Sequence, residues 1–101
     1  MAVIIALIIW AVCAGADIAY TRSGLDKGVA VEGNRVVVWF FGNKPKTWQL
    51  IIYDVVEAFW LCTPYLVAPD NPACVGITFG MLCGLAVRHV EGARAWRKLG
   101  A

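Results

Sequence analysis

The feature that most constrains this chain is the apolar run at its N-terminus. From Ala2 to Tyr20 the sequence holds one charged residue, Asp17, among hydrophobic and small residues. Such a run is long enough for a helix to cross about 30 Å of hydrocarbon. The composition agrees, because 60% of the 101 residues are hydrophobic and 16% are charged, whereas about a quarter of a soluble domain is charged. We expect an all-α membrane protein with a single domain over residues 1–101.

Within this run, Ala14-Gly15-Ala16 resembles the small-residue cleavage site of a signal peptide. A signal peptide begins with a positively charged region, and no basic residue precedes the apolar run here. We therefore expect the segment to be retained as a spanning helix over about residues 2–20.

Two further runs are candidates for spanning helices. Residues 47–68 are long enough to cross a bilayer even with Pro64 near their far end. After a short turn, residues 73–90 reach the required length if the helix continues through Arg88 and His89. A basic side chain at a helix end can extend to the membrane surface. The sequence thus predicts three transmembrane helices.

The remaining segments are too polar or too short to span. Thr21 to Arg35 carries several charges and glycines and is expected to form a polar connecting loop. Residues 36–42 are apolar but short, which is typical of an interfacial or re-entrant segment, with Trp39 at headgroup depth. The tail from Val90 to Ala101 has an amphipathic helical pattern, and we expect it to lie along the membrane surface.

The basic residues predict the orientation. All nine lie either between the first and second spans or at the end of the third span. They are Arg22, Lys27, Arg35, Lys44, Lys46, Arg88, Arg94, Arg97 and Lys98. Because basic loops stay on the cytoplasmic side, we expect an N-out, C-in protein of a prokaryotic inner membrane. A net charge of +2 without a basic stripe excludes a nucleic-acid partner.

Three carboxylates lie inside the predicted spans. Each of Asp17, Asp54 and Glu57 costs about 2.5 to 3.5 kcal/mol at a helix centre, so each should face protein or water. Asp54 and Glu57 are spaced i, i+3 and share a helix face, and Arg88 and His89 are the available partners. A structural salt bridge is the favoured interpretation. A proton or cation path and a metal site are the alternatives.

Small residues mark a packing face on the third span. Gly76, Gly80 and Gly84 form an uninterrupted small-xxx-small series, which lets another helix approach closely. The series does not tell whether that helix belongs to this chain or to another subunit.

The cysteines and the single histidine indicate little chemistry. Cys62 and Cys74 flank the outer turn, where an oxidising compartment would allow a disulfide. The sequence has one histidine, no phosphate-binding loop and no nucleophile motif. We therefore expect no enzyme and no cofactor.

The residues Asp17-x-x-x-Thr21, followed by Leu25, Gly28 and Glu32-x-Asn34, resemble the signature of an uncharacterised family of small prokaryotic three-span membrane proteins. Members of that family carry an intramembrane Asp and Thr and then a Glu-x-Asn-Pro turn; here Arg35 stands in place of the proline. The resemblance implies a local cluster of Asp17, Thr21, Glu32 and Asn34 at the cytoplasmic boundary, of an ion-binding kind.

The expected function is that of a non-enzymatic accessory or assembly subunit of a larger membrane complex, or of a homo-oligomer. Its partners would be the lipid bilayer and other membrane-protein subunits or itself. The layout is also similar to that of three-span phage holins, so a pore-forming protein is one alternative. Proton or cation conduction through the intramembrane carboxylates is the other.

Overall fold

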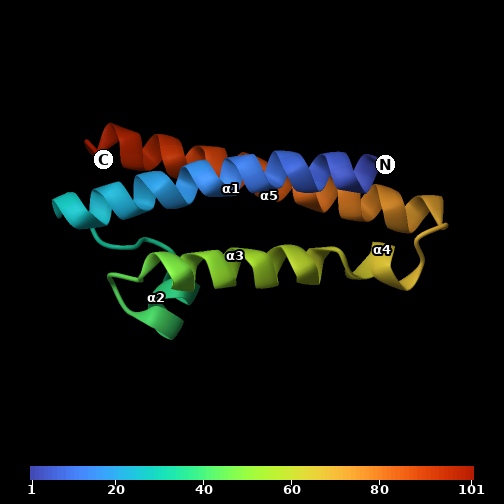
Figure 1. Ribbon diagram of the computed structural model, residues 1–101, viewed down its shortest axis with the longest axis horizontal. Helices are drawn as coiled ribbons and strands as arrows, with labels where there is room; N and C mark the ends of the chain where they lie inside the picture. The colour runs from blue at the N-terminus through green and yellow to red at the C-terminus, as the bar shows by residue number, and fades with distance from the viewer.

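Five helices and no strands make up the protein in a computed structural model that describes all residues from Met1 to Ala101. Three long rods lie side by side (Figure 1). They are α1 (Ala2–Lys27), α3 (Thr47–Leu61) followed by the short α4 (Thr63–Val67), and α5 (Pro72–Lys98). The short α2 (Arg35–Phe41) lies beside the beginning of α3. The expected all-α architecture is confirmed.

The rods alternate in direction along the chain. Helices α1 and α5 run the same way and α3 runs the opposite way, so the two termini lie at opposite ends of the bundle (Figure 1). Helix α1 packs along α5 far more extensively than either helix packs on α3. The bundle measures 47 × 24 × 17 Å. The pair of α1 and α5 therefore forms the framework on which α3 rests.

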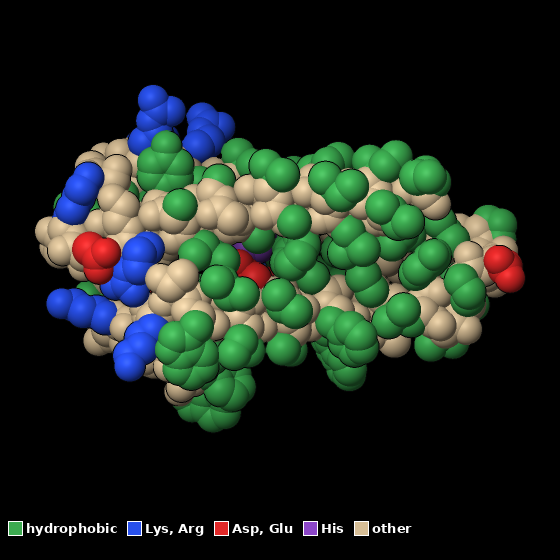
Figure 2. Space-filling model, viewed as in Figure 1, with side chains coloured by type: hydrophobic (Ala, Val, Ile, Leu, Met, Phe, Trp, Pro, Cys, Tyr) green, Lys and Arg blue, Asp and Glu red, His purple; other side chains and the backbone are tan.

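The surface of the bundle is unusually apolar. Only 19 of the 101 residues are buried, and large hydrophobic side chains are exposed on all three rods, as the green face in Figure 2 shows. Helices α1 and α5 are long and apolar enough to cross a membrane. Soluble monomers rarely expose contiguous apolar patches of this extent. The surface is compatible with a membrane protein.

The first helix is longer than the sequence predicted. Residues 21–27, expected in a polar loop, continue α1 for two more turns, and the helix ends at Gly28 in a left-handed conformation with φ of 68°. The amide of Val29 donates to the carbonyl of Gly24 across this end. The helix continues because Thr21, Gly24 and Leu25 recur at helical spacing and are buried. Polar composition alone did not distinguish this helical extension from a loop.

The C-terminal tail also differs from the prediction. It is not a separate helix lying along a membrane surface, because α5 continues without a break from Pro72 to Lys98. The buried side chains His89, Ala93 and Trp96 follow one another at spacings of four and three residues. This stripe packs the tail onto the extension of α1, where the ring of Trp96 lies over Gly24.

Helix α3 is interrupted near its far end. Proline at position 64 has no amide hydrogen, so it cannot donate to the carbonyl of Trp60 four residues earlier. The hydroxyl of Thr63 donates to that carbonyl instead, at 2.6 Å. The chain then forms α4 in the same general direction (Figure 1). The predicted span over residues 47–68 is thus two helices joined at Cys62.

The apolar segment at residues 36–42 is the helix α2. Its N-cap is Asn34, whose side-chain oxygen accepts the amides of Val36 and Val37 at 3.0 and 3.3 Å. Val37 is buried, whereas Trp39 and Phe40 point outwards. Their rings meet edge to face, with centroids 4.7 Å apart.

The glycines that allow close packing are not those that the sequence indicated. A Cβ atom built on Gly76, Gly80 or Gly84 would have no neighbour within 4 Å, so this face is not used within the chain. A Cβ on Gly24 would overlap the ring of Trp96, and one on Gly92 would lie 2.8 Å from Asp17 Oδ1. The close contacts between α1 and α5 depend on these two glycines.

No disulfide forms between Cys62 and Cys74, and all four cysteines are free thiols. Cys62 is buried in a hydrophobic cluster with Val3, Ala6, Ala58 and Leu82. Cys74 lies in the first turn of α5, where its amide donates to the Asn71 cap. The two residues thus belong to different structural units, although both border the same turn.

Candidate functional site

A cavity of about 360 Å³ lies between α1, α3 and α5 and is walled by the loop at residues 30–34. All eight polar residues singled out in the sequence, from the spans and from the loop, line this one cavity. They are Asp17, Thr21, Glu32, Asn34, Asp54, Glu57, Arg88 and His89. In Figure 2, acidic and histidine atoms are visible in the gap between α1 and α3, with hydrophobic side chains around them.

Asp17 and His89 form the clearest polar contact in the cavity. Nδ1 of His89 lies 2.7 Å from Oδ2 of Asp17. Because a carboxylate can only accept, Nδ1 carries the hydrogen and donates it. The hydroxyl of Thr21 donates to the other oxygen, Oδ1, at 3.5 Å. This contact joins α1 to α5 and leaves Nε2 of His89 buried without a hydrogen-bond partner.

Gly92 makes the approach of Asp17 to α5 possible. The carboxylate of Asp17 lies where a Cβ on residue 92 would be. Gly92 is three residues after His89, so both face α1 from the same side of α5. The missing side chain therefore provides the space in which the Asp17 carboxylate reaches the His89 ring.

Asp54 is a buried carboxylate without a partner. It is 8% exposed and lines the cavity, yet no protein group donates a hydrogen bond to it or forms an ion pair with it. Glu57 is half-buried one turn further along the same face of α3. Leaving a buried carboxylate unpaired is costly. The free energy for this arrangement must come from the rest of the fold or from a bound group.

The loop that closes one end of the cavity is held by short contacts. Oε1 of Glu32 accepts the amide of Asn34 at 3.0 Å, and the amide of Glu32 donates to the carbonyl of Asn43 at 3.0 Å. Nη1 of Arg22 donates to the carbonyl of Pro45 at 3.0 Å, tying the end of α1 to the start of α3. These contacts set the position of the loop against the mouth of the cavity.

The balance of charge in the cavity is negative. Four carboxylates line it, and the only basic side chains among its lining residues are His89 and Arg88. His89 is engaged with Asp17, whereas Arg88 is exposed and forms no salt bridge. Asp54 and Glu57 form no salt bridge, which favours a positively charged occupant.

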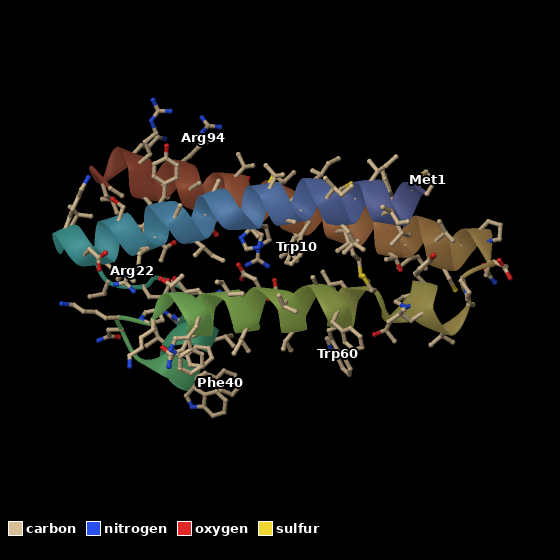
Figure 3. The ribbon with its side chains drawn as sticks, viewed as in Figure 1. Met1, Trp10, Arg22, Phe40, Trp60 and Arg94 are labelled. Carbon is tan, nitrogen blue, oxygen red and sulfur yellow. The ribbon has the colours of Figure 1, made fainter.

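The opposite half of the bundle is closed by apolar side chains. Val3, Ala6 and Leu82 are at most 2% exposed and pack with Ala58 in the hydrophobic core. Trp10 packs against this core and points from α1 towards α3 (Figure 3). The cavity thus ends at a dry layer and does not continue to the far end of the bundle.

Sequence reasoning missed Tyr53, Gly92 and Trp96 among the lining residues. A usable signal was present, because His89, Gly92 and Trp96 recur at helical spacing on one face of α5. The spacing does not reveal which face of α5 meets α1. The series of Gly76, Gly80 and Gly84 therefore gives the stronger packing signal in the sequence, although it is exposed.

Comparison of the chain with protein-family models, with curated proteins and with solved structures finds no match.

Proposed function

We propose that this chain is a three-span membrane protein that binds a cation in the cavity between α1, α3 and α5. The observation that carries the proposal is the buried, unpartnered carboxylate of Asp54 in a cavity with three further carboxylates. Ionisable groups within a membrane segment are costly and mark ion or ligand sites. A cation would offset this cost.

Binding is favoured over conduction by the apolar half of the bundle. A conducting path needs polar or water-filled space from one side of the membrane to the other, and the core of Val3, Ala6 and Leu82 closes one half. The proposed site therefore does not connect the two sides of the membrane. This geometry supports a receptor or carrier for a cation over an open channel.

The proposed three spans and their orientation have separate support. Residues 47–67 extend over about 31 Å at 1.5 Å per residue, which matches the hydrocarbon thickness. Figure 2 shows the Lys and Arg side chains of the visible face gathered at the end of the bundle where α1 ends and α3 begins. In the proposed N-out, C-in arrangement this end is cytoplasmic.

Cation-dependent thermal unfolding tests the proposal. The full chain in detergent would be titrated with sodium, potassium, magnesium, ammonium and methylammonium chlorides, with tetrapropylammonium chloride keeping the ionic strength constant. A ligand that binds only the folded state raises Tm with its concentration. We expect at least one of these cations to raise Tm, and Asp54→Asn to abolish the rise.

The matched control is Asp70→Asn, which removes an exposed carboxylate in the turn before α5. This variant should respond to the cation as the unmodified chain does. A chain whose Tm is the same in every salt, or equal responses of the two variants, would exclude a cation site at Asp54.

A second candidate function is assembly with another membrane protein or a second copy. The observation that favours it is the exposed face of Gly76, Gly80 and Gly84, which no part of this chain covers. Such a face admits close helix packing in a membrane. An accessory subunit or homo-oligomer could also hold a cation, so the two proposals are compatible.

Gly80→Leu separates assembly from folding. Nothing lies within 4 Å of a Cβ on Gly80. The added side chain should therefore change the free energy of unfolding of the isolated chain by less than about 1 kcal/mol. In an assembling protein it should reduce the mass of the complex in mild detergent. An unmodified chain that is monomeric at all concentrations and recovered without any partner would exclude this function.

A further inference from the structure

Asp54 and His89 together point to the kind of cation that the cavity takes. Each residue is 8% exposed. Nε2 of His89 is fully enclosed and has no hydrogen-bond partner, and the Asp54 carboxylate, which lines the cavity, forms no salt bridge. Asp54 comes from α3 and His89 from α5, so the unpaired groups belong to opposite walls of the cavity. Buried polar groups in proteins are nearly always paired, so two unpaired groups that face one cavity indicate a site for a water, an ion or a ligand.

The cavity is too large for a bare metal ion. A volume of about 360 Å³ falls in the range of small-molecule sites, roughly 300 to 1,000 Å³. A metal ion needs several ligands at about 2.0 to 2.6 Å, and no three His, Cys, Asp or Glu side chains of this chain come close enough to hold one. An occupant of molecular size fits the cavity better.

The lining has two chemically different parts. Asp54 and Glu57 present carboxylates from one face of α3, whereas ten of the twenty lining residues are hydrophobic. The apolar part includes Leu50, Leu85 and Trp96. A ligand that matches both parts carries a positive group on an apolar body.

The positive group is defined by its hydrogen bonds. A primary ammonium has three N–H donors and no acceptor, so it can donate to both carboxylates of α3 and still donate to a third acceptor. When His89 is neutral with its hydrogen on Nδ1, its unpaired Nε2 accepts this third N–H. A quaternary ammonium has no N–H to donate and would leave these acceptors without hydrogen bonds.

We propose that the cavity binds a primary ammonium group carried on a small apolar body, with the ammonium at Asp54 and Glu57 and the body against Leu50, Leu85 and Trp96. This inference rests on the proposed function and names the class of cation that it requires. The ammonium belongs either to a free alkylamine or to the headgroup of an ethanolamine lipid, because the cavity is visible from the side of the bundle between α1 and α3 (Figure 2).

Binding of a graded series of ammonium ions tests the inference. The full chain in detergent would be titrated by calorimetry with methylammonium, n-butylammonium, tetramethylammonium and sodium chlorides. We expect n-butylammonium to bind at least tenfold more tightly than methylammonium and than tetramethylammonium. We expect Asp54→Asn to weaken its binding at least tenfold, and Asp70→Asn to leave it unchanged. Glu57→Gln is the second cavity variant, should Asp54→Asn fail to fold.

The possible outcomes separate this inference from the proposed function. If sodium or tetramethylammonium binds as tightly as n-butylammonium and depends on Asp54, the cation site stands and the ammonium selectivity is wrong. If none of the four cations binds, the inference is wrong, and the proposed cation site is wrong too if potassium, magnesium and ammonium also leave Tm unchanged. Binding of n-butylammonium that is equal in the unmodified chain, Asp54→Asn and Glu57→Gln would also overturn the inference.

Lipid nanodiscs distinguish the two sources of the ammonium. The affinity for n-butylammonium would be measured in nanodiscs of phosphatidylcholine alone and in nanodiscs with phosphatidylethanolamine added. Weaker binding in the nanodiscs that contain phosphatidylethanolamine supports competition by the lipid headgroup. An unchanged affinity supports a free amine as the ligand.

Discussion

Asp54 shows how a single residue can serve binding at the expense of stability. Its carboxylate is nearly shielded from solvent and accepts no hydrogen bond from the protein. A buried polar group without a partner destabilises a fold by about 1 to 3 kcal/mol, and a charged one by more. The neighbouring Asp17 is in the opposite situation, because Thr21 and His89 both donate to it. Of these two carboxylates in one cavity, Asp17 joins α1 to α5, whereas Asp54 is free to bind a ligand.

Replacing Asp54 with leucine should stabilise the empty protein. Asp54→Leu removes the unpaired carboxylate and adds apolar volume, so we expect the free energy of unfolding to rise by about 1 to 2 kcal/mol. Chemical or thermal unfolding in detergent without added amine measures this change. A lower stability for Asp54→Leu, with Asp70→Asn unchanged, would mean that Asp54 has a stabilising partner in the empty protein.

The glycines give a second test at the scale of single residues. Gly92→Ala places a methyl group 2.8 Å from Asp17 Oδ1, so the carboxylate must move away from His89, at a cost of about 1 to 3 kcal/mol. Gly84→Ala is the matched control, because nothing lies within 4 Å of the added atom and alanine favours a helix by about 1 kcal/mol. Comparison of the two Tm values measures the difference. A Tm for Gly92→Ala at or above that of Gly84→Ala would contradict the close contact.

At the scale of whole elements, α1 and α5 owe their length to packing between them. The last two turns of α1 and the last two turns of α5 carry most of the charges of these helices, and neither segment belongs to a predicted span. They form helices because Gly24 of α1 meets the ring of Trp96 of α5, next to the contact between Asp17 and His89. The two helices therefore continue together beyond their apolar segments.

Trp96 should hold the end of α5 on α1. Trp96→Ala removes a buried ring, and such truncations cost about 3 to 5 kcal/mol in a well-packed core. We expect trypsin to cleave at Arg94, Arg97 and Lys98 at least tenfold faster in this variant. Trp60→Ala is the control, because that ring is 75% exposed and points away from the bundle (Figure 3). Equal cleavage of both variants would show that the tail is not docked.

The sequence predicted the polar residues of the site better than it predicted the elements that hold them. Spacing placed Asp54 and Glu57 on one face of a helix, and the cost of intramembrane charge pointed Asp17 inwards. It did not predict the ends of α1 and α5, because a polar helix that extends beyond an apolar segment has the same composition as a loop. It did not predict Gly24 and Gly92 as contact points either, because spacing within a helix contains no information on the distance to another helix.

The whole molecule has a polar interior at one end and an apolar interior at the other, within an apolar surface. The cavity lies at the end of the bundle that holds the 28–34 loop and the C-terminal ends of α1 and α5. The apolar core lies towards the other end, near the N-terminus. This asymmetry, together with the basic residues near the loop, distinguishes the two ends of the bundle. In our account the polar end faces the cytoplasm.

Cysteine labelling tests this orientation. In a background without native cysteines, Lys44→Cys and Asp70→Cys place a thiol at exposed positions near opposite ends of the bundle. We expect an impermeant maleimide to label residue 70 in intact cells, and residue 44 only after the cells are opened. Labelling of residue 44 in intact cells would reverse the proposed topology.

The proposed function requires a negatively charged, accessible cavity inside the apolar bundle. Its most direct test is the reaction of Leu50→Cys, in the same cysteine-free background, with methanethiosulfonate reagents of opposite charge. Leu50 is buried and lines the cavity, and this variant retains all four carboxylates. Because a cavity with one sign of charge concentrates counter-ions, we expect the aminoethyl reagent to react at least tenfold faster than the sulfonatoethyl reagent. Equal rates, or no reaction with either reagent, would contradict it.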